Sequence, residues 1–143
     1  RSAAHHRASS AVPDVLFEGE LREHHPELVG MGLRKMELTS ESVKYIETLA
    51  ADPRARGVGR YDLFALALAR QNGCQLLTGD SLLRALAEAE KREVRGTLWL
   101  VGELIRAGRI RVLRARRAYD AMRAAGRRLP WVEVERQLEE LED

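Results

Sequence analysis

The chain has 143 residues, of which 45% are hydrophobic and 32% charged, a composition typical of a globular protein long enough to bury a core. No apolar run reaches the ~20 residues of a membrane-spanning helix, and a single cysteine excludes an internal disulfide. The net charge of +2 is unevenly distributed, because residues 106–128 hold nine arginines and one acid, whereas residues 133–143 hold six acids and one arginine.

The N-terminal half of the chain alternates apolar runs with helical patterns. Residues 1–10 are small or polar without periodicity, so we expect a disordered or foreign leader. Strands are expected where apolar residues run together or alternate, and helices where they recur every three or four positions. In chain order, these patterns predict a strand ending at 11–13, a helix over 14–25, a strand over 33–38, a helix from Ser40 to about residue 52, and a basic loop over 54–59.

The second half begins with a nearly all-apolar helix, expected over 62–70 and stopped by Gly73. After it we expect a buried strand over 74–78, a helix over 81–90, a short strand over 93–95, and helices from Gly96 to Gly108, over 111–125 and over 131–141. Strand and helix alternate up to residue 95, which predicts an α/β fold with a parallel sheet. We therefore expect a single domain over 11–143, with an α/β core over 11–95 and a helical extension over 96–143.

Asp62 and Asp80 bracket the apolar helix and the strand that follows it. The helix spans ~15 Å and the strand ~16 Å, so the chain leaves and returns by a similar length. Both aspartates are then expected at the carboxyl edge of the strand, where open α/β sheets carry their sites. Two carboxylates meeting there would suit a hard divalent cation such as Mg²⁺ or Mn²⁺. The alternative is that both aspartates only cap helices.

Two further acids, Glu18 and Glu20, lie on the first expected helix. Residues two positions apart do not share a helix face, so we expect at most one of them to point into a common site. Asp14 precedes them and is expected to cap the helix. The sequence contains neither GxxxxGK[ST] nor GxGxxG, which predicts no nucleotide cofactor.

The arginine-rich segment 106–128 has two interpretations. It is either a solvated helix face answered by the acidic tail, or a phosphate-binding surface. The remaining conspicuous side chains, Cys74, Trp99 and Trp131, stand in apolar contexts. We expect a buried, unreactive thiol and two core tryptophans, and a single cysteine fits a cytoplasmic protein.

Five stretches occur in a characteristic order: VPDVLFEGEL (12–21), GRYDLFALALA (59–69), LLTGDSLLR (76–84), GTLWLVGELI (96–105) and RRLP (127–130). Together they resemble the PIN-domain family, metal-dependent ribonucleases that include the toxins of VapBC-type toxin–antitoxin pairs; GTLW and RRLP resemble a bacterial subgroup. The resemblance implies a three-layer fold, RNA as substrate and Mg²⁺ or Mn²⁺ as cofactor. It assigns Asp62, Asp80 and Glu20 as metal ligands, Glu18 as the alternative glutamate, and Thr78 beside the site. Gly19 stands where some relatives are expected to carry another acid.

The start of the chain departs from this pattern. PIN domains begin with a central strand that carries the first aspartate, and residues 1–10 contain no acid at all. Either the chain is truncated or the site has lost an acid, and a missing central strand would leave backbone groups of its neighbours unpaired.

We expect a PIN-type endoribonuclease, with no membrane association and with an antitoxin-like protein or a second copy of the chain as partner. The alternatives are a catalytically impaired PIN-like module that binds protein or RNA, and an arginine-driven nucleic-acid binder whose acids only cap helices.

Overall fold

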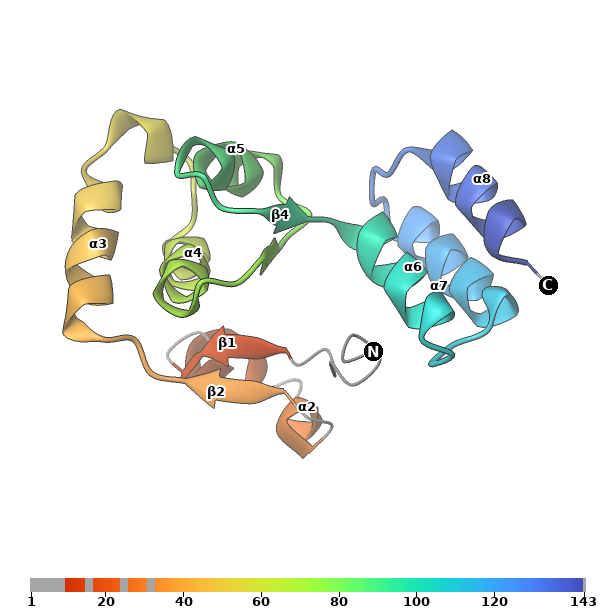
Figure 1. Ribbon diagram of the computed structural model, residues 1–143, viewed down its shortest axis with the longest axis horizontal. Helices are drawn as coiled ribbons and strands as arrows, with labels where there is room; N and C mark the ends of the chain where they lie inside the picture. Colours follow the sequence, from red (N-terminus) through yellow and green to blue (C-terminus); the bar gives the residue numbers. More distant parts are fainter. Residues whose placement is uncertain (1–9, 15–16, 24–25, 31–32, 143) are drawn as a thin grey trace, which may run out of the picture. The chain divides into compact units, whose positions relative to one another are not determined.

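The computed structural model describes residues 10–14, 17–23, 26–30 and 33–142 (Figure 1). These residues pack as two compact units, one ending at Val94 and the other beginning at Arg95. The first unit is mixed α/β and the second is helical. The predicted α/β fold is therefore confirmed.

The described strands of the first unit form two short pairs. Strands β1 (Ala11–Pro13) and β2 (Arg34–Met36) run parallel, with Pro13 opposite Met36. The other pair consists of β3 (Leu76–Leu77) and β4 (Val94–Arg95), and the Leu76 amide donates to the Glu93 carbonyl at 2.9 Å. Every described strand lies within the region where we expected one. Strand β1 has its predicted length, and the other three are shorter than predicted.

The segment between β1 and β2 differs from the predicted helix over 14–25. The chain forms a π-helix, η2 (Phe17–Leu21), in which the Arg22 amide donates to the Phe17 carbonyl at 2.8 Å, and then a turn at Arg22 and Glu23. Gly19, in the middle of η2, is a poor former of regular helix. A short helix that we did not predict, α2 (Glu27–Gly30), follows.

The remaining helices of this unit follow the sequence closely. They are α3 (Ser40–Ala50), the 3₁₀-helix η3 (Pro53–Ala55), α4 (Arg60–Asn72) and α5 (Ser81–Ala89). The N-cap of α3 is Thr39, because the Thr39 hydroxyl accepts a hydrogen bond from the Ser42 amide at 3.1 Å. Helix α4 ends at Gly73, whose φ of +61° lies in the left-handed region, so the predicted glycine stop is confirmed.

Helix α4 forms the centre of the first unit, with α3 and α5 packed against it (Figure 1). Its residues Leu63, Leu66 and Ala67 are buried, as are Leu49 of α3 and Leu83 of α5. Burying a leucine side chain contributes about 2 kcal/mol. The nearly continuous apolar sequence of α4 is thus explained by neighbours on several sides.

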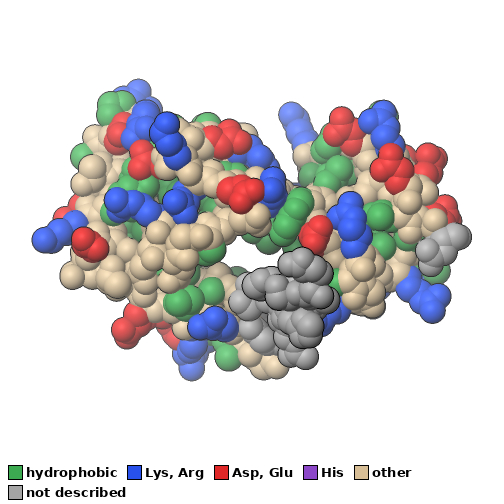
Figure 2. Space-filling view, viewed as in Figure 1, with side chains coloured by type: hydrophobic (Ala, Val, Ile, Leu, Met, Phe, Trp, Pro, Cys, Tyr) green, Lys and Arg blue, Asp and Glu red, His purple; other side chains and the backbone are tan. Residues whose placement is uncertain are grey.

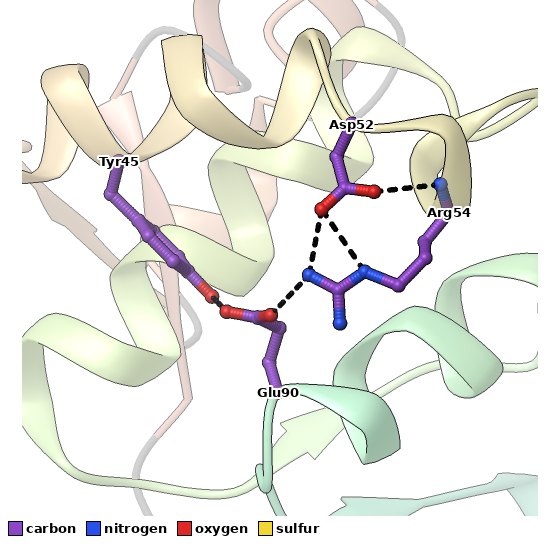
Figure 3. Close-up of polar contacts among 4 residues, drawn as sticks. All are labelled: Tyr45, Asp52, Arg54 and Glu90. Carbon is purple, nitrogen blue, oxygen red and sulfur yellow. Dashed lines mark hydrogen bonds and ion pairs between the residues drawn. The ribbon is translucent and has the colours of Figure 1, made fainter.

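A polar network fixes the C-terminal end of α5 (Figure 3). The Tyr45 hydroxyl donates to Glu90 Oε1 at 2.6 Å, and the Arg54 guanidinium donates to Glu90 Oε2 at 2.7 Å and to Asp52 at 2.8 Å. The hydrogen bond from Tyr45 and the charge of Arg54 lower the pKa of Glu90, whereas burial and Glu90 raise that of Tyr45. The network joins α3 and η3 to the C-terminal end of α5.

The second unit consists of α6 (Thr97–Arg106), α7 (Val112–Ala124) and α8 (Trp131–Leu141), three helices that the sequence predicted. They pack on one another around a core of Val101, Ala115, Tyr119, Val134 and Leu138. Within this core, the Tyr119 hydroxyl donates to Gln137 at 2.7 Å, and Gln137 donates to the Leu98 carbonyl at 2.7 Å. Burial raises the pKa of Tyr119 to about 12.

Two predictions about burial are wrong. Cys74 is exposed, because the chain turns after Gly73 and β3 begins only at Leu76. Trp99 is 38% exposed on α6, whereas Trp131 is half-buried, with its ring perpendicular to that of Tyr119.

In the described part of the chain, none of the helices has the length and apolarity to cross a bilayer.

Candidate acidic site

Asp80 stands at the junction of β3 and α5. Its amide donates to the Thr78 hydroxyl at 3.0 Å, and its Oδ2 accepts a hydrogen bond from the Leu83 amide at 2.8 Å. Asp80 is therefore the N-cap of α5, as the capping interpretation predicted, and its side chain is still exposed. The structure brings Thr78 and Asp80 together in one tight turn after the strand.

Asp62 lies in the first turn of α4 rather than at its cap. The helix begins at Arg60 with Gly59 as N-cap, so the expected start at Asp62 is off by two positions. Asp62 Oδ2 is 3.7 Å from the point where a Cβ on Gly59 would stand, which places the half-buried carboxylate over the helix start. A negative charge there interacts favourably with the helix dipole.

Three acids that surround the end of β1 and β2 line a pocket of about 630 Å³: Asp14, Glu18 and Glu37. Because the strands are parallel and Pro13 lies opposite Met36, the next residues, Asp14 and Glu37, share the carboxyl edge of the pair. The Gln71 side chain of α4 donates to the Glu37 carbonyl at 3.1 Å and holds this edge. Glu37 was not among the predicted site residues, because it lies within the strand predicted over 33–38.

Two cations neutralise Glu18. Arg22 donates to its Oε1 at 2.6 Å, and Lys35 lies 3.5 Å from its Oε2. The Arg22 hydrogen bond is the main reason why the pKa of Glu18 is lowered. The Glu20 side chain lies outside the described part, so the choice between Glu18 and Glu20 stays a prediction.

The π-helix η2 packs against the first turn of α4. A Cβ added to Gly19 would overlap the Tyr61 hydroxyl, so the Tyr61 ring closely covers the Gly19 backbone. The Tyr61 ring also meets Phe64 edge-on at 5.8 Å, and Arg60 lies over both rings. The structure therefore brings the FEGEL segment next to the residue that precedes Asp62. It also shows why position 19 holds a glycine beside this tyrosine.

The carboxylates of the candidate site are suitable ligands for a metal ion, but too few of them lie together in the described part of the chain. Carboxylate oxygens suit Mg²⁺ and Mn²⁺. Among the side chains that the structure describes, however, no three from His, Cys, Asp and Glu are arranged to hold a metal ion. The predicted ligand set of Asp62, Asp80 and Glu20 includes one side chain outside that description.

The mixed α/β unit is consistent with the fold of a PIN-type protein. A family model described as a PIN domain matches residues 16–143, so the chain belongs to the PIN-domain family, whose members are generally nucleases. The family resemblance inferred from the sequence is thus confirmed. Neither the curated proteins nor the solved structures contain a match to this chain.

Proposed function

We propose that this protein is an endoribonuclease of PIN type, with Asp80 as its central site residue. Membership of a nuclease family supports the class of reaction. The observation that carries the residue assignment is the turn after β3, where Thr78 and the start of α5 fix an exposed carboxylate at the end of a strand. Packing of Gly19 on Tyr61 places the glutamate-bearing segment beside the start of α4, which carries Asp62.

We further propose Mg²⁺ or Mn²⁺ as cofactor, with Asp62, Asp80 and Glu20 as ligands and Glu18 as the alternative. Such an ion supplies an activated water and neutralises charge on the scissile phosphate. The chain's own part is to hold the carboxylates in place. The Leu83 amide fixes one oxygen of Asp80, and the Thr78 hydroxyl fixes its backbone.

Asp80→Asn is the sharpest test of this proposal, because asparagine is an equally good N-cap and should keep α5 intact. We expect cleavage of single-stranded RNA in Mg²⁺ or Mn²⁺ to fall by at least about 10²-fold, since the variant loses a charged ligand. The melting temperature should not change. Glu88→Gln, at an exposed position of the same helix α5, is the matched control and should cleave like wild type. Equal cleavage by wild type and Asp80→Asn would remove Asp80 from the mechanism.

A second candidate is a catalytically impaired PIN-like module that binds protein or RNA. It is favoured by one observation, the lack of a three-acid metal cluster among the described side chains. Titration calorimetry with Mn²⁺ separates the two candidates. Heat of binding that Asp80→Asn abolishes supports the nuclease, whereas no measurable binding supports the module.

The toxin role is proposed on the sequence resemblance alone, together with an antitoxin-like or homodimeric partner. Induced expression in a bacterial host should arrest growth with the wild-type chain and not with Asp80→Asn. Normal growth with both would leave a nuclease without toxin activity.

A further inference from the structure

The arginines of the C-terminal unit differ in whether they have partners. Within residues 106–128, four arginines make contacts inside the unit: Arg106 with Glu103 at 3.0 Å, Arg116 with Glu135 at 2.7 Å, Arg123 over the Trp131 ring at 5.0 Å, and Arg127 with the Thr97 hydroxyl at 3.0 Å. Arg116, Arg123 and Arg127 connect different elements of the unit, whereas the Arg106–Glu103 pair lies within α6. Binding a ligand through these arginines would therefore break contacts that they make inside the unit.

A second group of arginines is concentrated at the start of α7: Arg109, Arg111, Arg114 and Arg117. All four are exposed, and none makes an ion pair with any acid in the part of the chain that the structure describes. Arg111, Arg114 and Arg117 follow one another at intervals of three, which places neighbours about one helical turn apart. We call these four residues the α7 arginine cluster.

The cluster is unfavourable for the helix that carries it. The first turn of α7 contains no acidic residue, and the N-cap Arg111 makes no side-chain capping hydrogen bond. Positive side chains near a helix start oppose the helix dipole, and like charges one turn apart repel each other. The acids of α8 do not relieve this, since the one α8 acid in an ion pair with α7 is Glu135, which pairs with Arg116. Figure 2 shows basic and acidic side chains on the face of the molecule turned to the viewer.

We propose that the α7 arginine cluster is a phosphate-binding surface that holds the backbone of single-stranded RNA. Its residues are different from the acids of the candidate site in the first unit. The assignment to RNA rests on the proposed ribonuclease function, whereas the preference for a polyanion rests on the uncompensated charge. Guanidinium groups bind phosphate through paired hydrogen bonds. A protein partner fits less well, because protein interfaces have an apolar, aromatic centre and the large exposed hydrophobic residue within this segment is Leu113 alone.

The test measures affinity for a fluorescent single-stranded RNA by anisotropy, with the full chain, in EDTA and over a series of NaCl concentrations. Each arginine that neutralises a phosphate of a single strand contributes about 0.7 to the slope of log affinity against log salt. Arg109→Gln, Arg111→Gln, Arg114→Gln and Arg117→Gln together should lower the slope by about 3 and the affinity by more than tenfold.

The matched control carries four glutamines at Arg106, Arg116, Arg123 and Arg127, which changes the net charge by the same amount. We expect it to keep most of the slope, because these arginines already have partners. Equal losses in the two variants would show a general effect of net charge and overturn the proposal. The milder pair Arg114→Gln and Arg117→Gln, both at exposed positions, should lower the slope by about 1.4 and guards against misfolding of the fourfold variant.

Two further results separate this proposal from others. Asp80→Asn should bind RNA in EDTA like wild type. If this variant loses cleavage but keeps the salt dependence of its RNA affinity, RNA binding by the arginine cluster is supported. If the wild-type chain cleaves RNA but its affinity does not depend on salt, RNA binding by the cluster is overturned and the nuclease proposal stands. Competition by polyglutamate as effective as that by RNA would show an acidic protein as the partner and overturn the RNA assignment.

Discussion

Tyr45→Phe tests how the end of α5 is held in the first unit. The change removes one hydroxyl, which donates to Glu90 at 2.6 Å, and leaves the ring in place beneath the Arg70 guanidinium at 4.1 Å. A hydrogen bond to a charged acceptor contributes about 1.5–3 kcal/mol in a dry site. Glu90 is 20% exposed and Tyr45 is half-buried, so water screens the pair and we expect a loss of about 1 kcal/mol.

The measurement is a double-mutant cycle of Tyr45→Phe and Glu90→Gln, by urea unfolding at pH 7. The two changes should not add, because each removes the same charged hydrogen bond, and the coupling should be about 1 kcal/mol. Glu88→Gln is the matched control on the same helix. Glu88 is 59% exposed and 3.7 Å from Arg84, so its replacement should change stability little.

The pH dependence gives an independent check on Glu90. Its pKa in the folded protein is lowered from 4.5, first by the Tyr45 hydrogen bond, so the unfolded chain binds a proton more readily. The stabilisation is therefore fully present above pH 4.5 and disappears as the pH falls through the lower folded value. Wild type should lose its advantage over Glu90→Gln in that acidic range. Additive changes at pH 7, or an advantage that persists at low pH, would refute the reasoning.

Three other outcomes are expected. Leu66→Ala should destabilise the chain by about 2–5 kcal/mol in urea unfolding, because Leu66 is fully buried in α4, whereas Leu82→Ala, at a position 49% exposed, should cost far less. Gly19→Ala should lower the melting temperature, because the new methyl group meets Tyr61, and Tyr61→Ala should remove most of that penalty when the two are combined. Cys74 should react with a thiol reagent in the folded protein as fast as in urea, since it is exposed; slow labelling would contradict its placement.

Several features of the fold follow from local sequence. Helix α4 ends where Gly73 permits a left-handed backbone, and α5 begins where Asp80 caps it. The helices of the C-terminal unit lie where apolar residues recur every three or four positions. These features depend on residues within a few positions of one another. Helix propensity and capping rules describe such local features, and the stretches that resemble the PIN-domain family contain several of them in order.

Features of the candidate site are instead set by contacts between distant parts of the chain. Glu37 joins Asp14 only because two parallel strands pair in one register. Gly19 is covered by Tyr61 only because η2 packs on α4, and no local pattern in FEGEL predicts that contact.

The sequence by itself determined the α/β class and the positions of most helices, because these depend on short-range spacing and composition, and its ordered motifs carried the resemblance to the PIN-domain family. The tertiary structure alone decided which acids share an edge and which arginines of α7 are already paired. Both depend on how elements pack, and packing selects among side-chain partners that are equally compatible with the local sequence.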